Sequence, residues 1–165
     1  MNKIKNIDPK MIVYSDETGI DDNEVSLMGW APVGKRCYAL KNAERKKRFN
    51  IIAALNLNKI FAPFVFEGYS NAHIYETYIA QVLVPVLEPG MVLVIDNASF
   101  HKSKRITDLI ESAKCSVLFL PPYTPEFNPI ENHWSAIKTA IRRTFDKTKD
   151  FLKSIIEVLS EKCLA

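Results

Sequence analysis

Residues 91–97 read MVLVIDN, five apolar side chains followed by the carboxylate of Asp96 and the amide of Asn97. Apolarity that continues without alternation is typical of a central strand that is covered on both faces. A second run, residues 11–16, reads MIVYSD, is rich in β-formers and also ends in an aspartate, Asp16. We therefore predict two buried strands, each followed by a carboxylate.

The two aspartates would meet if their strands were parallel neighbours in one sheet. Neighbouring strands lie roughly 5 Å apart, and carboxylates at that separation repel unless a proton or a cation lies between them. Hard oxygen ligands of this kind suit Mg²⁺ or Mn²⁺. Open sheets also bind their ligands beyond the carboxyl ends of the strands. The pattern thus predicts a divalent metal site at Asp16 and Asp96.

The rest of the chain alternates short apolar runs with helical patterns, which indicates an α/β fold. Further strands are predicted at 25–31 and 48–57, in an antiparallel meander with the strand at 11–15, and at 116–120. Helices are predicted from an N-cap at Ser70 or Asn71 to Val82, around 106–113, from Pro129 past Ile141, and over 149–162. A proline-rich loop at 121–128 precedes the third of these helices.

A third carboxylate is needed to hold a second ion, and Glu131 is the candidate. It lies in the first turn of the helix that follows the proline-rich loop. Residues 128–131, NPIE, also form a good capping box, with Asn128 as N-cap and Glu131 at the third helical position. On local sequence alone capping is the stronger interpretation, and the two roles compete for one side chain.

Three motifs change that balance when they are considered together: SDETG at 15–19, IDNASFH at 95–101 and PPYTPEFNPIENHW at 121–134. This set closely resembles the catalytic domain of mariner-related bacterial insertion-sequence transposases, which are DDE endonucleases with an RNase H-like fold. The third motif is long and specific. Thirty-four residues, 97–130, separate Asp96 from Glu131, a spacing typical of that superfamily. The resemblance extends from about Met11 to Arg143 and includes GWAPVG at 29–34 as a second-strand turn.

The resemblance implies a five-stranded mixed sheet, with three antiparallel strands and then two parallel ones, flanked by helices. Asp16, Asp96 and Glu131 match the acidic triad of the family. Two Mg²⁺ or Mn²⁺ ions about 3.5–4 Å apart stabilise both the attacking and the leaving oxygen of an in-line displacement at phosphorus. The implied reactions are cleavage of DNA at the ends of the element and strand transfer into a target, typically a TA dinucleotide.

Members of this family usually carry an N-terminal helix-turn-helix region, for which the strand near Met11 leaves no space, so we expect a single catalytic domain over 1–165. A homodimer on DNA is implied by the resemblance, and a separate helix-turn-helix protein would be a further partner. One alternative is a catalytically idle, truncated remnant that binds only DNA or a full-length transposase. Another is a hybrid-cleaving RNase H-like nuclease, against which the proline-rich motif argues.

Contacts to DNA are expected from a basic run and from residues near the triad. Between Lys35 and Arg48 there are seven basic residues and one acid, Glu44. The candidate contacts are Lys35, Arg36, Arg45, Lys46, Lys47, Arg48, Asn97, His101 and Tyr123. The alternatives are a solvated loop for the run, a turn residue for Asn97, a structural role or the orientation of a neighbour of Asp96 for His101, and a loop anchor for Tyr123. Trp134 fits the apolar stripe of its helix, so core packing is expected for it.

Composition excludes several other classes of protein. The chain has 165 residues, of which 47% are hydrophobic and 25% charged, as in one soluble globular domain. A net charge of +3 does not by itself imply nucleic acid. Cys37, Cys115 and Cys163 form no CxxC pair, which argues against a disulfide framework or a zinc site. There is no apolar run of about 18 residues and no signal peptide, so we expect a cytoplasmic protein, and the family resemblance implies a bacterial, nucleoid-associated one.

Overall fold

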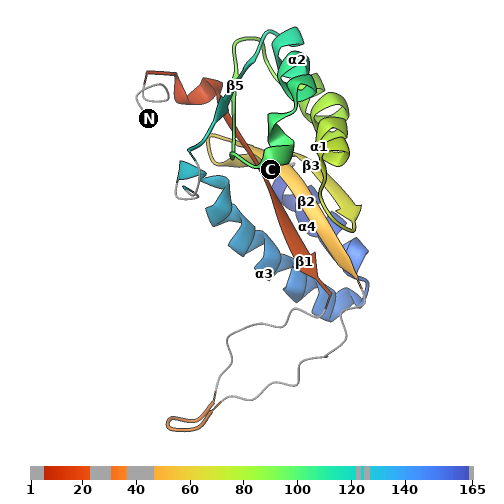
Figure 1. Cartoon of the computed structure of the whole chain (residues 1–165). Helices are drawn as coiled ribbons and strands as arrows, with labels where there is room; N and C mark the ends of the chain where they lie inside the picture. Colours follow the sequence, from red (N-terminus) through yellow and green to blue (C-terminus); the bar gives the residue numbers. More distant parts are fainter. Residues whose placement is uncertain (1–5, 23–30, 37–46, 122–123, 125–126, 164–165) are drawn as a thin grey trace.

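The computed structural model describes residues 6–22, 31–36, 47–121, 124 and 127–163. Its centre is a five-stranded sheet in the order β3-β2-β1-β4-β5 (Figure 1). The strands are β1 (Ile12–Asp21), β2 (Arg48–Asn56), β3 (Lys59–Glu67), β4 (Val92–Ile95) and β5 (Ser116–Phe119). The first three pair in antiparallel fashion, and β1, β4 and β5 are parallel neighbours. The predicted mixed sheet is therefore confirmed, with β1 in its middle.

The identity of the antiparallel strands differs from the prediction. The strand expected at 25–31 falls outside the described residues except for Ala31, which belongs to no strand. The third antiparallel strand is instead β3, a segment to which the sequence analysis assigned no strand. It follows β2 through a two-residue turn, Leu57 and Asn58, both with positive φ (47° and 73°). Two consecutive residues in this conformation give the tight turn that joins antiparallel strands.

Helices cover both faces of the sheet. They are α1 (Ala72–Tyr78), α2 (Lys104–Ser112), α3 (Ile130–Thr148) and α4 (Phe151–Cys163), with single turns at Pro9–Met11, Ile79–Leu83, Val84–Val86 and Ser99–Lys102. Asn71 caps α1, as predicted, because its side chain accepts a hydrogen bond from Ile74 N at 3.0 Å. No helix in the described ranges is long and apolar enough to cross a membrane.

The side chains of β2 point alternately to the two faces of the sheet, so they contribute to two separate buried clusters. Phe49, Ile51 and Leu55 lie in one buried cluster with residues of α3 and α4. Ile52 and Ala54, which point to the opposite face, pack with residues of α1 and α2. The result is a three-layer sandwich in which α3 runs alongside β1 (Figure 1).

Candidate active site

Strand register brings the two aspartates together. Tyr14 of β1 is the partner of Val94 of β4 in the parallel ladder, so two residues further along each chain Asp16 comes opposite Asp96. Side chains two residues apart point to the same face, which here is the α3 side of the sheet. The prediction that the strand ends at Asp16 is wrong, because β1 continues to Asp21 and pairs with β2 over this length. Asp16 therefore lies inside a strand, whereas Asp96 directly follows one.

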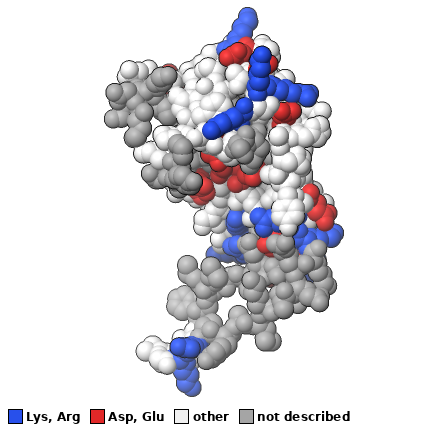
Figure 2. Space-filling model, in the orientation of Figure 1, with Lys and Arg blue, Asp and Glu red and all other residues white. Residues whose placement is uncertain are grey.

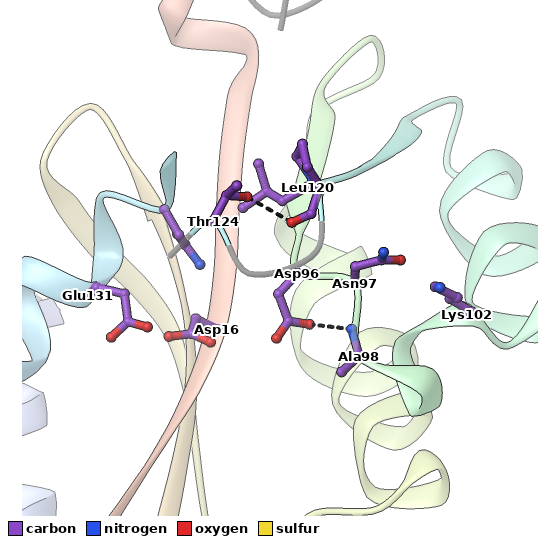
Figure 3. A pocket seen from close by; sticks show the side chains of 10 residues that line it. Asp16, Asp96, Asn97, Ala98, Lys102, Leu120, Thr124 and Glu131 are labelled. Atoms are coloured by element: carbon purple, nitrogen blue, oxygen red, sulfur yellow. Dashed lines mark hydrogen bonds between the residues drawn. The ribbon is translucent and has the colours of Figure 1, made fainter. Parts of the chain in front are cut away.

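A pocket of about 610 Å³ opens at this place. It is lined by Asp16, Asp96, Asn97, Ala98, Lys102, Leu120, Pro121, Thr124, Asn128 and Glu131. The carboxylates of Asp16 and Glu131 point toward one another from β1 and from the start of α3, and Asp96 enters the same space from the end of β4 (Figure 3). Three carboxylates from three separate elements thus face one cavity.

Asp16 is the most enclosed of the three carboxylates, with an exposed fraction of 8%. Its Oδ2 accepts a buried hydrogen bond of 2.9 Å from the indole Nε1 of Trp134. Burial, with smaller contributions from the negative charges of Glu131 and Asp96, raises the pKa of Asp16 to about 6 against the lowering effect of the hydrogen bonds from Trp134 and the Glu17 backbone. Ionisation of Asp16 is therefore less favourable than that of an exposed aspartate, and a nearby cation would ease it.

Asp96 is surrounded by donors. Its Oδ1 accepts a hydrogen bond from Ala98 N at 3.0 Å and another from Nδ1 of His101. The bond from His101 lowers the pKa of Asp96, with burial opposing and Ala98 N contributing in the same direction. The His101 ring is 1% exposed and packs against Tyr75, with 4.0 Å between ring centroids. The burial of the ring argues against a DNA contact by His101, and the ring bonds to Asp96 itself rather than to a neighbour of Asp96.

Glu131 is exposed at the start of α3, and it makes no capping box. Pro129 occupies the N-cap position, no side chain caps the helix, and Glu131 N bonds to the backbone oxygen of Asn128 at 3.2 Å. The side chain of Asn128 is instead buried, 4% exposed, at the pocket wall, and its Oδ1 has no hydrogen-bond partner within the described ranges. The local interpretation as a capping box was therefore wrong, which leaves both side chains available to the pocket.

The other predicted contact residues are dispersed. Asn97 lines the pocket. Lys35 and Arg36 are exposed in segment 31–36, which lies away from the sheet (Figure 1), and Lys47 is exposed before β2. Arg48 forms an ion pair with Asp21 at 3.4 Å. Arg45, Lys46 and Tyr123 lie outside the described residues.

Sequence analysis missed three side chains of the site. Lys102 and Asn128 line the pocket. Trp134 is 3% exposed in the core, as expected, but its indole also contacts Asp16. A signal for this contact exists in the sequence, because Trp134 follows Glu131 by three residues and so shares its helix face, and a buried indole N–H requires an acceptor.

The donor set of the pocket fits divalent cations. Carboxylate and amide oxygens are hard ligands. A cation would offset the repulsion that Asp16 meets from Glu131 and Asp96, and it would give Asn128 Oδ1 the partner that this oxygen lacks within the described ranges. Across the part of the chain that is described, no three His, Cys, Asp or Glu side chains lie close enough to share a single ion. Two ions divide the three carboxylates between them, so this separation is compatible with a two-ion site.

Comparison with known proteins agrees with this geometry. The family described as "DDE superfamily endonuclease" matches residues 11–153. No curated protein matches the chain. The structure is similar to the Mos1 transposase paired-end complex with left transposon end, at a TM-score of 0.68 and 18% identity over 99% of this chain and 57% of that one. The chain thus spans less than two thirds of the length of Mos1 transposase.

Two further solved structures widen the comparison. The Mos1 mariner paired-end complex with Mn gives a TM-score of 0.66 at 17% identity, over 99% of this chain and 57% of the other. The catalytic core domain of BIV integrase gives 0.56 at 14% identity, over 92% of this chain and 82% of the other. These likenesses establish the fold, the RNase H-like arrangement of transposase and integrase cores.

Proposed function

The chain belongs to the DDE superfamily endonucleases, and we propose that it is a transposase catalytic domain that cuts DNA and transfers the cut strand with two Mg²⁺ or Mn²⁺ ions. The observation that carries the proposal is the meeting of Asp16, Asp96 and Glu131 at one pocket. These side chains come from two neighbouring strands and a helix, so the fold itself brings them together.

In this proposal the three carboxylates are metal ligands, and no residue forms a covalent bond with DNA. When bound, the two metal ions would supply positive charge that stabilises the attacking and leaving oxygens of an in-line displacement at phosphorus. Asp16 and Asp96 each have one oxygen held by a protein donor, which fixes how the carboxylate faces the pocket. Lys102 and Asn97 line the same pocket and offer donors to phosphate oxygens.

The charge distribution supports DNA as the substrate. Acidic side chains gather in the middle of the face in view, with Lys and Arg above and below them (Figure 2). An acidic centre repels a phosphodiester unless cations occupy it, whereas basic flanks attract the backbone on either side. The Mos1 structures are a paired-end complex and a strand transfer complex. By this comparison we extend to this chain the binding of element ends, whereas a TA target, a homodimer on DNA and a separate helix-turn-helix protein are proposed from the family resemblance alone.

The test is nicking of a supercoiled plasmid with Mn²⁺ by the wild type and two variants. Asp96→Ala removes a proposed ligand, and Asp108→Ala removes an exposed carboxylate on α2 as a matched control. We expect nicking by the wild type and Asp108→Ala and a loss of at least about a thousandfold for Asp96→Ala, which corresponds to about 4 kcal/mol of lost transition-state stabilisation.

Calorimetric titration with Mn²⁺ separates the ways in which the proposal could fail. Manganese uptake without nicking by any of the three proteins would identify the idle, DNA-binding alternative. No manganese uptake by the folded wild type would remove the metal-dependent enzyme altogether. Nicking that survives in Asp96→Ala would place the chemistry elsewhere.

A further inference from the structure

Helix α3 contributes two side chains to the site, one at the pocket and one beneath it. Glu131 and Trp134 are three residues apart and so lie on one face of the helix. Glu131 is exposed and lines the pocket, whereas Trp134 is 3% exposed and packs in the cluster that contains Ile137 and Ile141. The same helix face therefore carries a carboxylate at the pocket and an indole in the core between α3 and the sheet.

The indole of Trp134 ends at Asp16. Its Nε1 donates to Asp16 Oδ2 over 2.9 Å, in a buried contact between residues 118 positions apart in sequence. An indole N–H can only donate, and it carries no charge. It therefore fixes one oxygen of Asp16 without adding a positive charge that would compete with a cation.

We infer that Trp134 is a positioning residue, which holds Asp16 in its metal-binding orientation and ties that orientation to the docking of α3. Because Glu131 lies in the same part of α3, the packing of α3 against the sheet positions the carboxylates of Asp16 and Glu131 together. The inference rests on the proposed function, since it concerns the geometry of the proposed metal ligands. A purely structural role, in which Asp16 merely satisfies a buried indole, is the alternative.

The test is Mn²⁺ binding by Trp134→Phe, which keeps an aromatic side chain and loses the N–H. We expect an affinity about tenfold weaker than that of the wild type, because the unheld carboxylate has to be ordered when the ion binds. The matched control is Ile137→Val, a buried position on the same helix face with no polar atom. It should lower the unfolding midpoint and leave the affinity unchanged.

A second substitution keeps the test decisive if the phenylalanine variant does not fold. Benzothienylalanine at position 134 replaces the N–H with sulfur and retains the bicyclic shape, and the same tenfold loss is expected. In an Asp16→Asn background either substitution should have no further effect on affinity, as expected for an effect that acts through Asp16. Wild-type affinity in the folded Trp134 variants would overturn the inference alone. A wild type that binds no Mn²⁺ would overturn the proposed function and this inference with it.

Discussion

Asp16 and Asp96 face the same pocket from neighbouring strands, but their surroundings differ in burial and in the donor that each meets. Asp16 is 8% exposed and bonded to a neutral indole, and its pKa rises to about 6. The Asp96 side chain is 49% exposed and bonded to His101 and a backbone N–H, and its pKa falls below the usual value. The same residue type is therefore harder to ionise than usual within β1 and easier to ionise than usual just after β4.

The position of each residue in the fold explains the contrast. Asp16 lies within β1, where the strand continues and Trp134 of α3 contacts it, so little of its carboxylate is exposed to water. Asp96 follows the end of β4, where the chain turns and its own backbone donates to the carboxylate. In the proposed site Asp96 is already held as an anion, whereas the anion of Asp16 is less favourable than usual, a cost that a bound cation would offset.

The largest expected effect tests whether this difference matters to chemistry. Asp16→Asn and Asp96→Asn should each lower the single-turnover rate of Mn²⁺-dependent DNA cleavage by at least about a thousandfold. Both carboxylates are proposed ligands, so their different surroundings should not protect either variant. Asp108→Asn serves as the control on α2. A loss confined to one aspartate would show that only that residue contacts the ions.

The next largest effect concerns how the unfolding free energy of the metal-free protein depends on pH, to which the two aspartates contribute with opposite signs. A folded-state pKa raised from 3.8 to about 6 means that Asp16 contributes stability fully at low pH and loses it as the pH rises through about 6. The loss amounts to about 2 kcal/mol of unfolding free energy between pH 4 and pH 7. Asp96 acts with the opposite sign, since its lowered pKa gives stability that disappears only as the pH falls below its unfolded value.

Urea unfolding of the metal-free wild type and of Asp16→Asn at several pH values measures this contribution. The wild type should lose stability across the window from pH 4 to pH 7, and Asp16→Asn should show a flatter profile there. Parallel profiles for the two proteins would show that Asp16 is not the source of the step.

Much of the sheet could be predicted because its parallel strands are short, apolar and buried. The runs at 91–95 and 116–120 correspond to β4 and β5 within one residue at each end. Helices α1 to α4 were predicted from apolar spacing and from caps such as Asn71. The two aspartates were correctly predicted to lie close together, because parallel neighbours bring residues at equal distances from a paired position opposite each other.

The strands that the sequence analysis missed depend on tertiary context. Strand β3 contains Pro63 and an irregularity at Ala62, which has a φ of 51°, and both features argue against a strand. They are tolerated because β3 lies at the edge of the sheet. Its turn carries Leu57 at positive φ, where glycine or asparagine is the usual signal.

The extension of β1 was missed for a related reason. Residues 16–21 read DETGID and have low β-propensity, yet they pair with β2 throughout. The ion pair between Asp21 and Arg48 closes this end of the ladder at 3.4 Å. Pairing with an already formed apolar strand outweighs the local preference.

A smaller effect should follow from removing the donor of Asp96. His101→Phe keeps a ring against Tyr75 and loses Nδ1, so the carboxylate of Asp96 loses a hydrogen bond. We expect the unfolding free energy at pH 7 to fall by about 2 kcal/mol, the range for a bond to a charged group. The control is His73→Phe on the exposed side of α1, which should change it by less than about 0.5 kcal/mol. Equal values for the two variants would mean that His101 does not stabilise Asp96.

The smallest effect on stability is expected at Glu131, the third carboxylate of the pocket. Glu131→Gln should change the unfolding free energy by less than about 0.5 kcal/mol, because the side chain is exposed and caps nothing. A capping box would instead lose about 1 kcal/mol. Since the charge of Glu131 raises the pKa of Asp16, the stability step assigned to Asp16 should move to lower pH in this variant. Urea unfolding across the same pH series measures both quantities, and an unmoved step would separate Glu131 electrostatically from Asp16 and so from the site.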